Sequence, residues 1–316
     1  MEADELPYIS VIITAYKRKD FLLNAIKSVV NQTLNKKYYE IIVIKNFRDE
    51  NIDDFINKNE IVGIISNDNS LQGKLIEALN VAKGTIISFL EDDDLFFENK
   101  LEIVYKEFKK DMNIVYYHNL YAPINKNGEP INVNNVNTRL DFNMSSISIK
   151  KSIVEIHNAN KINLAQDWLM YLYALESDKK IIEGKEKLTY YMFHNSASNT
   201  ASITACKNIG EYRKFVIGRS DLYLSTCMYL NNLFHSKKAI NYINFQITHL
   251  QIDSYIFGSN EFPSKLINYI INRLDKFKVK VELILVCIVI KIYPDCRKYF
   301  INKLWNMHSK QFNEVI

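Results

Sequence analysis

The chain has 316 residues, of which 47% are hydrophobic and 24% charged, and its formal net charge is +4. This length predicts two domains, or one large domain with an extension, and the mixed composition excludes a fibrous or low-complexity protein. None of the eight glycines has the spacing of a dinucleotide-binding loop, a phosphate-binding loop or a hydrolase nucleophile elbow. Enzymes built on those three motifs are therefore excluded.

The cysteines and apolar segments indicate a reduced protein without a membrane span. No C-x-x-C pair or zinc-binding spacing occurs, so we interpret the four cysteines as reduced core thiols: Cys206, Cys227, Cys287 and Cys296. The acidic start Met1–Glu5 lacks the features of a secretory signal, which favours the cytoplasm. The longest apolar run, Leu283–Ile290, has eight residues, whereas a spanning helix requires about 18–20.

Charge is distributed unevenly along the chain. Residues 261–316 carry ten Lys and Arg against five Asp and Glu, or +5, which leaves −1 for residues 1–260. The larger part is therefore not a nucleic-acid surface, and we expect no nucleic-acid partner. The basic C-terminal part has two open interpretations: peripheral contact with the inner face of the cell membrane, or a solvated helical bundle. The oligomeric state also stays open, with a homo-oligomer among the expectations.

The first part of the chain alternates between predicted strands and helices. Short β-branched runs indicate buried strands, and apolar residues repeating every three or four positions indicate helices. Asp20 is the expected N-cap of the first helix, and Gly84 the expected C-cap of the third. The strands are expected at 9–14, 39–44, 62–66 and 85–90, and the helices at 21–30, 51–58, 71–82 and 95–109. This alternation predicts a parallel sheet covered by helices.

The pattern changes in the second half of the chain. Further strands are predicted at 113–117, 145–149 and 188–193, with an apolar helix at 164–175. Beyond residue 204 the apolar spacing is helical throughout. We therefore place the domain boundary near Ala205.

The most informative feature is the run Glu91-Asp92-Asp93-Asp94, which directly follows the fourth predicted strand. Ligands of such sheets bind beyond the carboxyl ends of the strands. Adjacent carboxylates repel one another unless a cation or several donors share the site, and oxygen-only ligands suit Mg²⁺ or Mn²⁺. The alternative is a solvated acidic cap on the expected helix 95–109, where negative charge is favourable in any case.

Two more polar residues stand at the ends of predicted elements. Asp167 lies near the start of helix 164–175, and His194 follows strand 188–193. An acidic residue in a first helical turn also has a purely structural interpretation. The same holds for a single histidine at the end of a strand.

Several segments together resemble the family 2 glycosyltransferases of the GT-A fold. They are Ile9–Arg18, Glu40–Ile44, Gly73, Ala78–Gly84, Ile87–Asp94 and Lys100-Leu101. No segment would suffice alone, but their order and spacing are specific. With Gln166-Asp167 and His194, the resemblance covers about residues 7–200.

The resemblance implies an α/β protein of the GT-A type, with a mixed, mainly parallel sheet, helices on both faces and a C-terminal helical extension. It implies a catalytic domain at 1–205, with a nucleotide-sugar-binding half at 1–97 and an acceptor half at 98–205, and a helical domain at 206–316. The implied reaction transfers a sugar, with inversion, from a nucleoside diphosphate sugar to a hydroxyl of a glycan or lipid-linked acceptor. UDP-sugars are favoured over GDP- or dTDP-sugars.

The resemblance also implies roles for individual residues. Asp167 would be the catalytic base that takes the acceptor proton. Glu91, Asp93 and His194 would hold Mn²⁺ or Mg²⁺, which neutralises charge on the leaving diphosphate. The nucleotide sugar would be bound by Thr14, Ala15, Tyr16, Arg18, Asn46, Gly73, Lys74 and Asp92.

The sequence departs from the family pattern at three places. Glu91 takes the first position of the D-x-D motif, Lys45-Asn46 stands where two aspartates are usual, and Gln166 replaces one acid of a Glu-Asp pair. These departures keep one alternative open, a catalytically degenerate GT-A-fold protein that binds nucleotide sugars or acts as a scaffold. A Mg²⁺-dependent phosphoryl transferase is disfavoured, because Thr14-Ala15-Tyr16 supplies no phosphate-accepting aspartate after the first strand.

Overall fold

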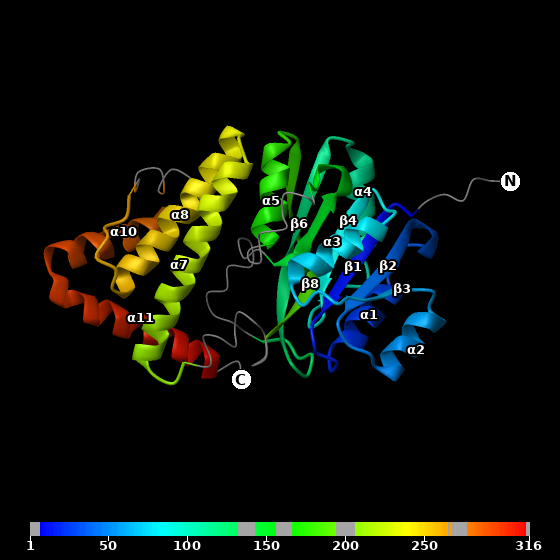
Figure 1. Cartoon of the computed structure of the whole chain (residues 1–316), viewed down its shortest axis with the longest axis horizontal. Helices are drawn as coiled ribbons and strands as arrows, with labels where there is room; N and C mark the ends of the chain where they lie inside the picture. Colours follow the sequence, from blue (N-terminus) through cyan, green and yellow to red (C-terminus); the bar gives the residue numbers. More distant parts are fainter. Residues whose placement is uncertain are drawn as a thin grey trace. The chain divides into compact units, whose positions relative to one another are not determined.

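The computed structural model describes residues 7–131, 143–155, 166–193, 206–264, 266, 269 and 277–313. The chain divides into two compact units, Met1–Met192 and Phe193–Ile316, and each is described by itself. In Figure 1 the first unit runs from blue to green and the second from yellow-green to red. The domain boundary expected near residue 205 lies outside the described residues and stays a prediction.

The N-terminal unit is built on one eight-stranded sheet of order β3-β2-β1-β4-β7-β6-β8-β5. The first four strands of that order are parallel, whereas β7 runs antiparallel to both β4 and β6, and β5 antiparallel to β8. The predicted α/β sheet is thus confirmed as a mixed one (Figure 1). Its strands are β1 (Ile9–Ala15), β2 (Tyr39–Lys45), β3 (Val62–Ile65), β4 (Ile86–Glu91), β5 (Leu95–Phe96), β6 (Ile114–Asn125), β7 (Ile147–Lys150) and β8 (Lys180–Phe193).

Helices cover both faces of this sheet. Every second residue of β1, beginning with Ile9, Val11 and Ile13, belongs to a buried cluster that includes residues of α1, α2 and α4. The helix α3 packs on β1 and β2 through residues outside that cluster, such as Leu75 and Leu79. Because side chains alternate along a strand, α3 covers the opposite face. The helices are α1 (Leu22–Val30), α2 (Glu50–Lys58), α3 (Leu71–Val81), α4 (Lys100–Lys110) and α5 (Gln166–Glu176).

Three local expectations were wrong. Asp20 does not cap α1, because Phe21 occupies the N-cap position without a side-chain bond. Gly84 is not the C-cap of α3, because Ala82 occupies that position with an extended backbone. The glycine is required elsewhere, since a Cβ there would lie 2.4 Å from the backbone N of Ser10. The segment after Asp94 is not helical but forms the short strand β5, and α4 starts only at Lys100.

The C-terminal unit is helical in its described residues, which confirms the predicted extension. Its buried cluster includes Tyr212, Ile252, Ile256, Cys287 and Ile301, so all four long helices contribute to one core. No helix in the described part of the chain is long and apolar enough to cross a membrane. The helices are α7 (Ile209–Leu233), α8 (Lys237–Phe257), α10 (Phe277–Ile292) and α11 (Arg297–Asn313).

The four cysteines are free. Cys227 and Cys287 are buried, and burial raises the pKa of each thiol to about 12. A thiol of that pKa stays protonated at neutral pH and is a poor nucleophile. The core-thiol interpretation therefore holds for these two, whereas Cys206 and Cys296 are only half-buried.

Candidate active site

The acidic run lies at the point where the strand order of the sheet reverses. The chain runs from β1 outward to β2 and β3 and then returns to β4 on the other side of β1. Thr14, at the end of β1, pairs with Glu91, and Ala15 pairs with Lys45 of β2. Carboxyl ends of strands at such a switch point form the crevice in which α/β proteins bind ligands.

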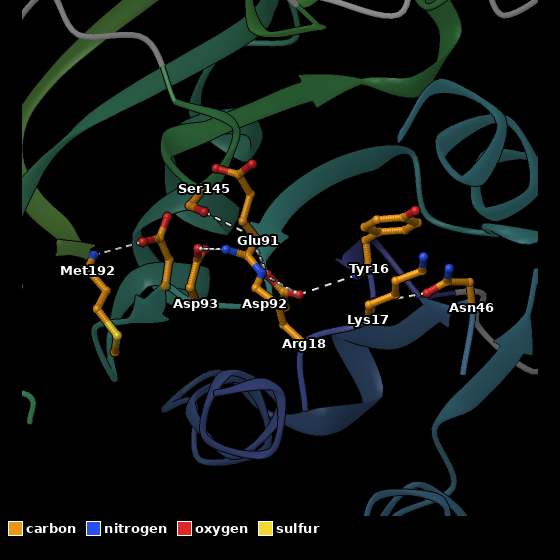
Figure 2. A network of polar contacts seen from close by, with 10 residues as sticks. Tyr16, Lys17, Arg18, Asn46, Glu91, Asp92, Asp93, Ser145 and Met192 are labelled. Carbon is orange, nitrogen blue, oxygen red and sulfur yellow. Dashed lines mark hydrogen bonds and ion pairs between the residues drawn. The ribbon is translucent and has the colours of Figure 1, made fainter. Parts of the chain in front are cut away.

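Arg18 forms ion pairs with two of the four carboxylates (Figure 2). Its Nε lies 3.3 Å from Oδ2 of Asp92, Nη2 donates to Oδ1 of the same carboxylate, and Nη1 lies 2.6 Å from Oδ2 of Asp93. The backbone N of Tyr16 also donates to Asp92, at 3.4 Å. Burial raises the pKa of Asp92 to about 6, the charge of Asp93 adds to this shift, and Arg18 opposes it.

Glu91, Asp93 and Asp94 form a group with the geometry of a cation site. One oxygen of each lies within 4.8 Å of the others. Oδ1 of Asp94 accepts a hydrogen bond from the backbone N of Met192 at 2.9 Å, but its Oδ2 is buried and has no partner among the described residues. Burial raises the pKa of Glu91 and of Asp94 well above the usual range, and the Asp93 charge adds to both shifts. A hard divalent cation fits this oxygen-only set.

A buried lysine, Lys100, is linked to this group through Ser145. Lys100 is fully buried, and its Nζ donates to the backbone O of Ser145 and, at 3.1 Å, to Oγ1 of Thr189. Ser145 Oγ in turn accepts the backbone N–H of Glu91 at 3.0 Å. Burial lowers the pKa of Lys100 well below its ordinary value, and Asp94 opposes the shift. These hydrogen bonds link β4, α4 and β8. The spacing of the residues in the sequence does not predict them.

Asn46 is held beside the end of β1. Its Oδ1 accepts the backbone N–H of Lys17 at 3.0 Å, and its Nδ2 donates to Oδ1 of Asn69 at 3.0 Å. Lys17 has a positive φ of 57°, so the chain turns sharply here. Lys45 is directed to another partner, because its buried Nζ lies 2.6 Å from Oδ1 of Asp53. The expected role of Asn46 in binding the nucleotide sugar stays a prediction.

Tyr16, Gly73 and Lys74 lie together on the α3 side of the crevice. The Nζ of buried Lys74 is 4.9 Å from the ring centroid of exposed Tyr16 and donates to the backbone O of Ser70 at 3.1 Å. Burial lowers the pKa of Lys74, while Asp68 opposes the shift. A Cβ at residue 73 would lie 1.8 Å from Oδ2 of Asp68, so only glycine fits there without moving that carboxylate.

Asp167 stands in the first turn of α5 and is half-buried. Its Oδ1 accepts the adjacent backbone N–H of Trp168 at 3.0 Å. Its charge is among those that raise the pKa of Glu91, so its carboxylate is within electrostatic reach of the acidic group. Gln166 beside it is buried. His194, the expected third metal ligand, lies outside the described residues.

The structure therefore brings together most of the residues singled out in the sequence, and it adds two. Asp94 joins Glu91 and Asp93, the two expected metal ligands within the described residues, whereas Asp92 pairs with Arg18 outside this group. Lys100 was part of the family resemblance but had no role assigned. Asp94 belongs to the acidic run itself, but the partners that position Asp94 and Lys100 are Met192, Ser145 and Thr189, which lie far away in the sequence, so a local pattern could not assign these contacts.

Comparison with known sequences agrees with this geometry. The sequence model of glycosyl transferase family 2 matches residues 10–164. An uncharacterized glycosyltransferase of Rickettsia bellii is 33% identical over 125 residues, which is 38% of this chain but 18% of that protein. The poly(ribitol-phosphate) beta-N-acetylglucosaminyltransferase TarP of Staphylococcus aureus is 24% identical over 201 residues, or 60% of this chain and 54% of TarP.

Solved structures show the same fold at low sequence identity. TarS of S. aureus in complex with UDP-GlcNAc has a TM-score of 0.53 and 12% identity, covering 89% of this chain and 80% of that one. The mannosyltransferase PcManGT of Pyrobaculum calidifontis in complex with GDP-Man and Mn²⁺ has a TM-score of 0.53 and 10% identity, covering 92% and 88%. With the mixed sheet, these similarities show that the chain has the GT-A fold, and the match over residues 10–164 makes that part of the chain similar to glycosyl transferase family 2.

Proposed function

We propose that the protein is a metal-assisted, inverting glycosyltransferase that moves a sugar from a nucleoside diphosphate sugar to a hydroxyl of a glycan or lipid-linked acceptor. The observation that carries this proposal is the group formed by Glu91, Asp93 and Asp94 at the strand switch point, within reach of the Asp167 charge. This arrangement brings oxygen ligands for a cation near a candidate base, Asp167, that comes from a different element. In a displacement at the anomeric carbon, the cation stabilises the leaving diphosphate and the base accepts the proton of the attacking hydroxyl.

The donor would lie on the side of Tyr16, Asn46 and Lys74. The exposed Tyr16 ring offers a face for stacking, and the Asn46 amide keeps one N–H and one oxygen lone pair for a base edge besides its bonds to Lys17 and Asn69. TarS and PcManGT are seen with UDP-GlcNAc and GDP-Man, which supports a nucleotide-sugar donor. We favour a UDP-sugar, as the family resemblance implies.

Glu91, Asp93 and Asp94 would hold Mn²⁺ or Mg²⁺, and His194 stays a proposed further ligand. The ion, when bound, neutralises negative charge that develops on the departing diphosphate. The presence of Mn²⁺ in the PcManGT complex supports a divalent ion in this fold. Asp92, fixed by Arg18 and the Tyr16 N–H, would orient the donor.

Asp167 would take the proton from the acceptor hydroxyl as that oxygen attacks the anomeric carbon. Its place at the start of α5 brings a carboxylate from the acceptor half to the acidic group. A single positioned base suffices for inversion, because the displacement occurs in one step without a covalent intermediate.

Hydrolysis of UDP-GlcNAc and GDP-Man, each with and without Mn²⁺, tests the proposal before the acceptor is known. We expect slow release of the nucleoside diphosphate from at least one donor, and its loss when the ion is chelated. Donor binding seen as a thermal shift without any release would support the alternative, a degenerate protein that only binds nucleotide sugars. Neither binding nor release of a wider donor set, including dTDP-sugars, would contradict both.

Arg18→Ala should change metal binding and transfer in opposite directions. Arg18 now neutralises Asp92 and Asp93, so its removal leaves the acidic group with more uncompensated negative charge. We expect Mn²⁺ to bind the donor-free protein about tenfold more tightly or better, which is about 1.4 kcal/mol, while transfer falls. Titration of free Mn²⁺ by electron paramagnetic resonance measures this.

The matched control for Arg18 is Lys19→Ala, which removes a neighbouring positive charge that pairs with Asp49 outside the acidic group. This control should bind Mn²⁺ as the wild type does. Unchanged or weaker Mn²⁺ binding by Arg18→Ala would show that the guanidinium does not compete with the ion.

We further propose that residues 206–316 form a separate domain that contacts the inner face of the cell membrane from the cytoplasm. On α10, Leu285, Ile288 and Ile292 follow one another at helical spacing and are 54%, 39% and 61% exposed. Exposed Lys291 and Lys298 lie nearby in the sequence. An apolar stripe with basic neighbours is typical of a helix that lies on an anionic bilayer.

The double variant Leu285→Ser/Ile292→Ser should lose binding to vesicles that contain phosphatidylglycerol, measured by sedimentation. The wild type should bind these vesicles, dissociate from them at high salt and not bind phosphatidylcholine vesicles. Leu222→Ser/Met228→Ser on α7 is the control, because both residues are exposed but lie outside the basic part. No vesicle binding would contradict the proposal, and a dimer abolished by the same double variant would assign the stripe to a homo-oligomer.

A further inference from the structure

A pocket of about 850 Å³ lies beside α1 in the N-terminal unit. It is lined by α1, by the segment 95–99, by the turn at 126–128, and by Tyr190 and Met192 of β8. We call it the α1 pocket. Its volume is in the range of ~300–1,000 Å³ that is typical of pockets for small organic ligands.

One end of the α1 pocket is connected to the acidic group. Leu95, which lines it, directly follows Asp94 in the chain, and the backbone N–H of Met192 binds Oδ1 of Asp94 at 2.9 Å. Figure 2 shows Met192 on one side of the acidic residues, with Tyr16 and Asn46 on the other. The α1 pocket therefore starts next to the proposed reaction centre, on the side away from the proposed donor site.

Four side-chain amides line the α1 pocket without hydrogen bonds to the described part of the chain: Asn24, Asn31, Asn99 and Asn127. Each amide offers two N–H donors and one acceptor. Hydroxyl groups both donate and accept, so they match amides better than purely anionic or purely apolar groups do. Asn24 and Asn31 belong to one wall and Asn127 to another, which suits a ligand with hydroxyls along its length.

The remaining lining fits the same class of ligand. The rings of Phe97 and Tyr190 stack with centroids 4.0 Å apart and an angle of 13° between their planes. Because the two rings stack on each other, each has only its outer face left, and that negative face can contact C–H groups of a ligand. Lys27 and Lys126 outnumber Glu98 in the lining, so negative charge on the ligand would be tolerated.

We infer that the α1 pocket binds the acceptor chain next to the hydroxyl that receives the sugar, and that this chain is rich in hydroxyl groups. The inference rests on the proposed function, since it takes the reaction centre from it. It names a binding surface that is separate from the donor site and the acidic group.

Binding of labelled probes without donor tests this by fluorescence anisotropy. The probes are a ribitol phosphate hexamer, maltohexaose, which has hydroxyls but no charge, and inorganic polyphosphate, which has charge but no hydroxyls. The variant Asn24→Ala/Asn127→Ala removes one amide from each wall. Asn51→Ala/Asn57→Ala on α2 removes two exposed amides outside the pocket.

We expect at least one hydroxyl-bearing probe to bind, and the pocket variant to bind it about tenfold more weakly or worse, as two lost hydrogen bonds imply. The α2 variant should bind like the wild type. A preference for the ribitol phosphate hexamer over maltohexaose would show that the lysines contribute. The inference is overturned if neither hydroxyl probe binds, if the pocket variant binds normally, or if polyphosphate binds as tightly as the hydroxyl probes.

Donor hydrolysis by the same pocket variant separates the two proposals. Water needs no acceptor pocket, so hydrolysis by Asn24→Ala/Asn127→Ala should match the wild type. Absence of hydrolysis in the wild type would count against the proposed function. Normal hydrolysis with unchanged probe binding in the variant would count against the α1 pocket alone.

Discussion

Asp93→Asn is expected to lower turnover by at least about 10³-fold, because it removes a carboxylate from the group that would neutralise the departing diphosphate. Asp93 lies in this group with Glu91 and Asp94 and also pairs with Arg18. The change is close to isosteric, so the loss should come from charge rather than from packing. Donor hydrolysis at saturating Mn²⁺, with Mn²⁺ binding measured separately, gives the result.

The same variant should leave the fold intact and should not lower the melting temperature of the metal-free protein. The charge of Asp93 adds to the raised pKa of Glu91, Asp92 and Asp94, so in the absence of a cation it is a source of repulsion. Asp54→Asn, at an exposed position on α2, serves as the control. Wild-type turnover by Asp93→Asn at equal Mn²⁺ would show that the metal assignment is wrong.

The second large effect is expected for Asp167→Asn. An amide cannot accept the acceptor proton, so transfer should fall by roughly 10²–10⁴-fold, the usual contribution of a positioned general base. Donor binding should be preserved, because Asp167 lies on α5 and not among the residues proposed to bind the nucleotide. Calorimetric donor binding and single-turnover transfer distinguish the two steps.

Glu176→Gln, at the other end of α5, is the matched control and should keep wild-type transfer. Near-normal transfer by Asp167→Asn would move the base elsewhere, with the nearest alternatives among the carboxylates of Glu91–Asp94. A loss of donor binding in Asp167→Asn would instead give Asp167 a role in holding the donor.

The sequence was sufficient for the parallel half of the fold. Buried β-branched runs at 9–14 and 39–44 became β1 and β2, and the amphipathic spacing after residue 20 became α1. These patterns are local, because the alternation of buried and exposed residues in a strand or helix repeats within a few residues. Local signals were ambiguous at element ends. Asp20 and Gly84 had the chemistry of caps but were not used as caps: Phe21 is the N-cap of α1, and Gly84 lies against the backbone of β1.

By itself, the sequence determined that an acidic run would end a buried strand at the ligand-binding edge of a sheet, because strand direction follows from the order of the elements. Only the tertiary structure decided which partner each of those carboxylates has. Arg18 pairs with Asp92 and Asp93, while Asp94 accepts the Met192 N–H near buried Lys100. These partners lie 74 and 98 residues apart in the chain. Contacts over such separations depend on strand order and packing, which no local spacing encodes.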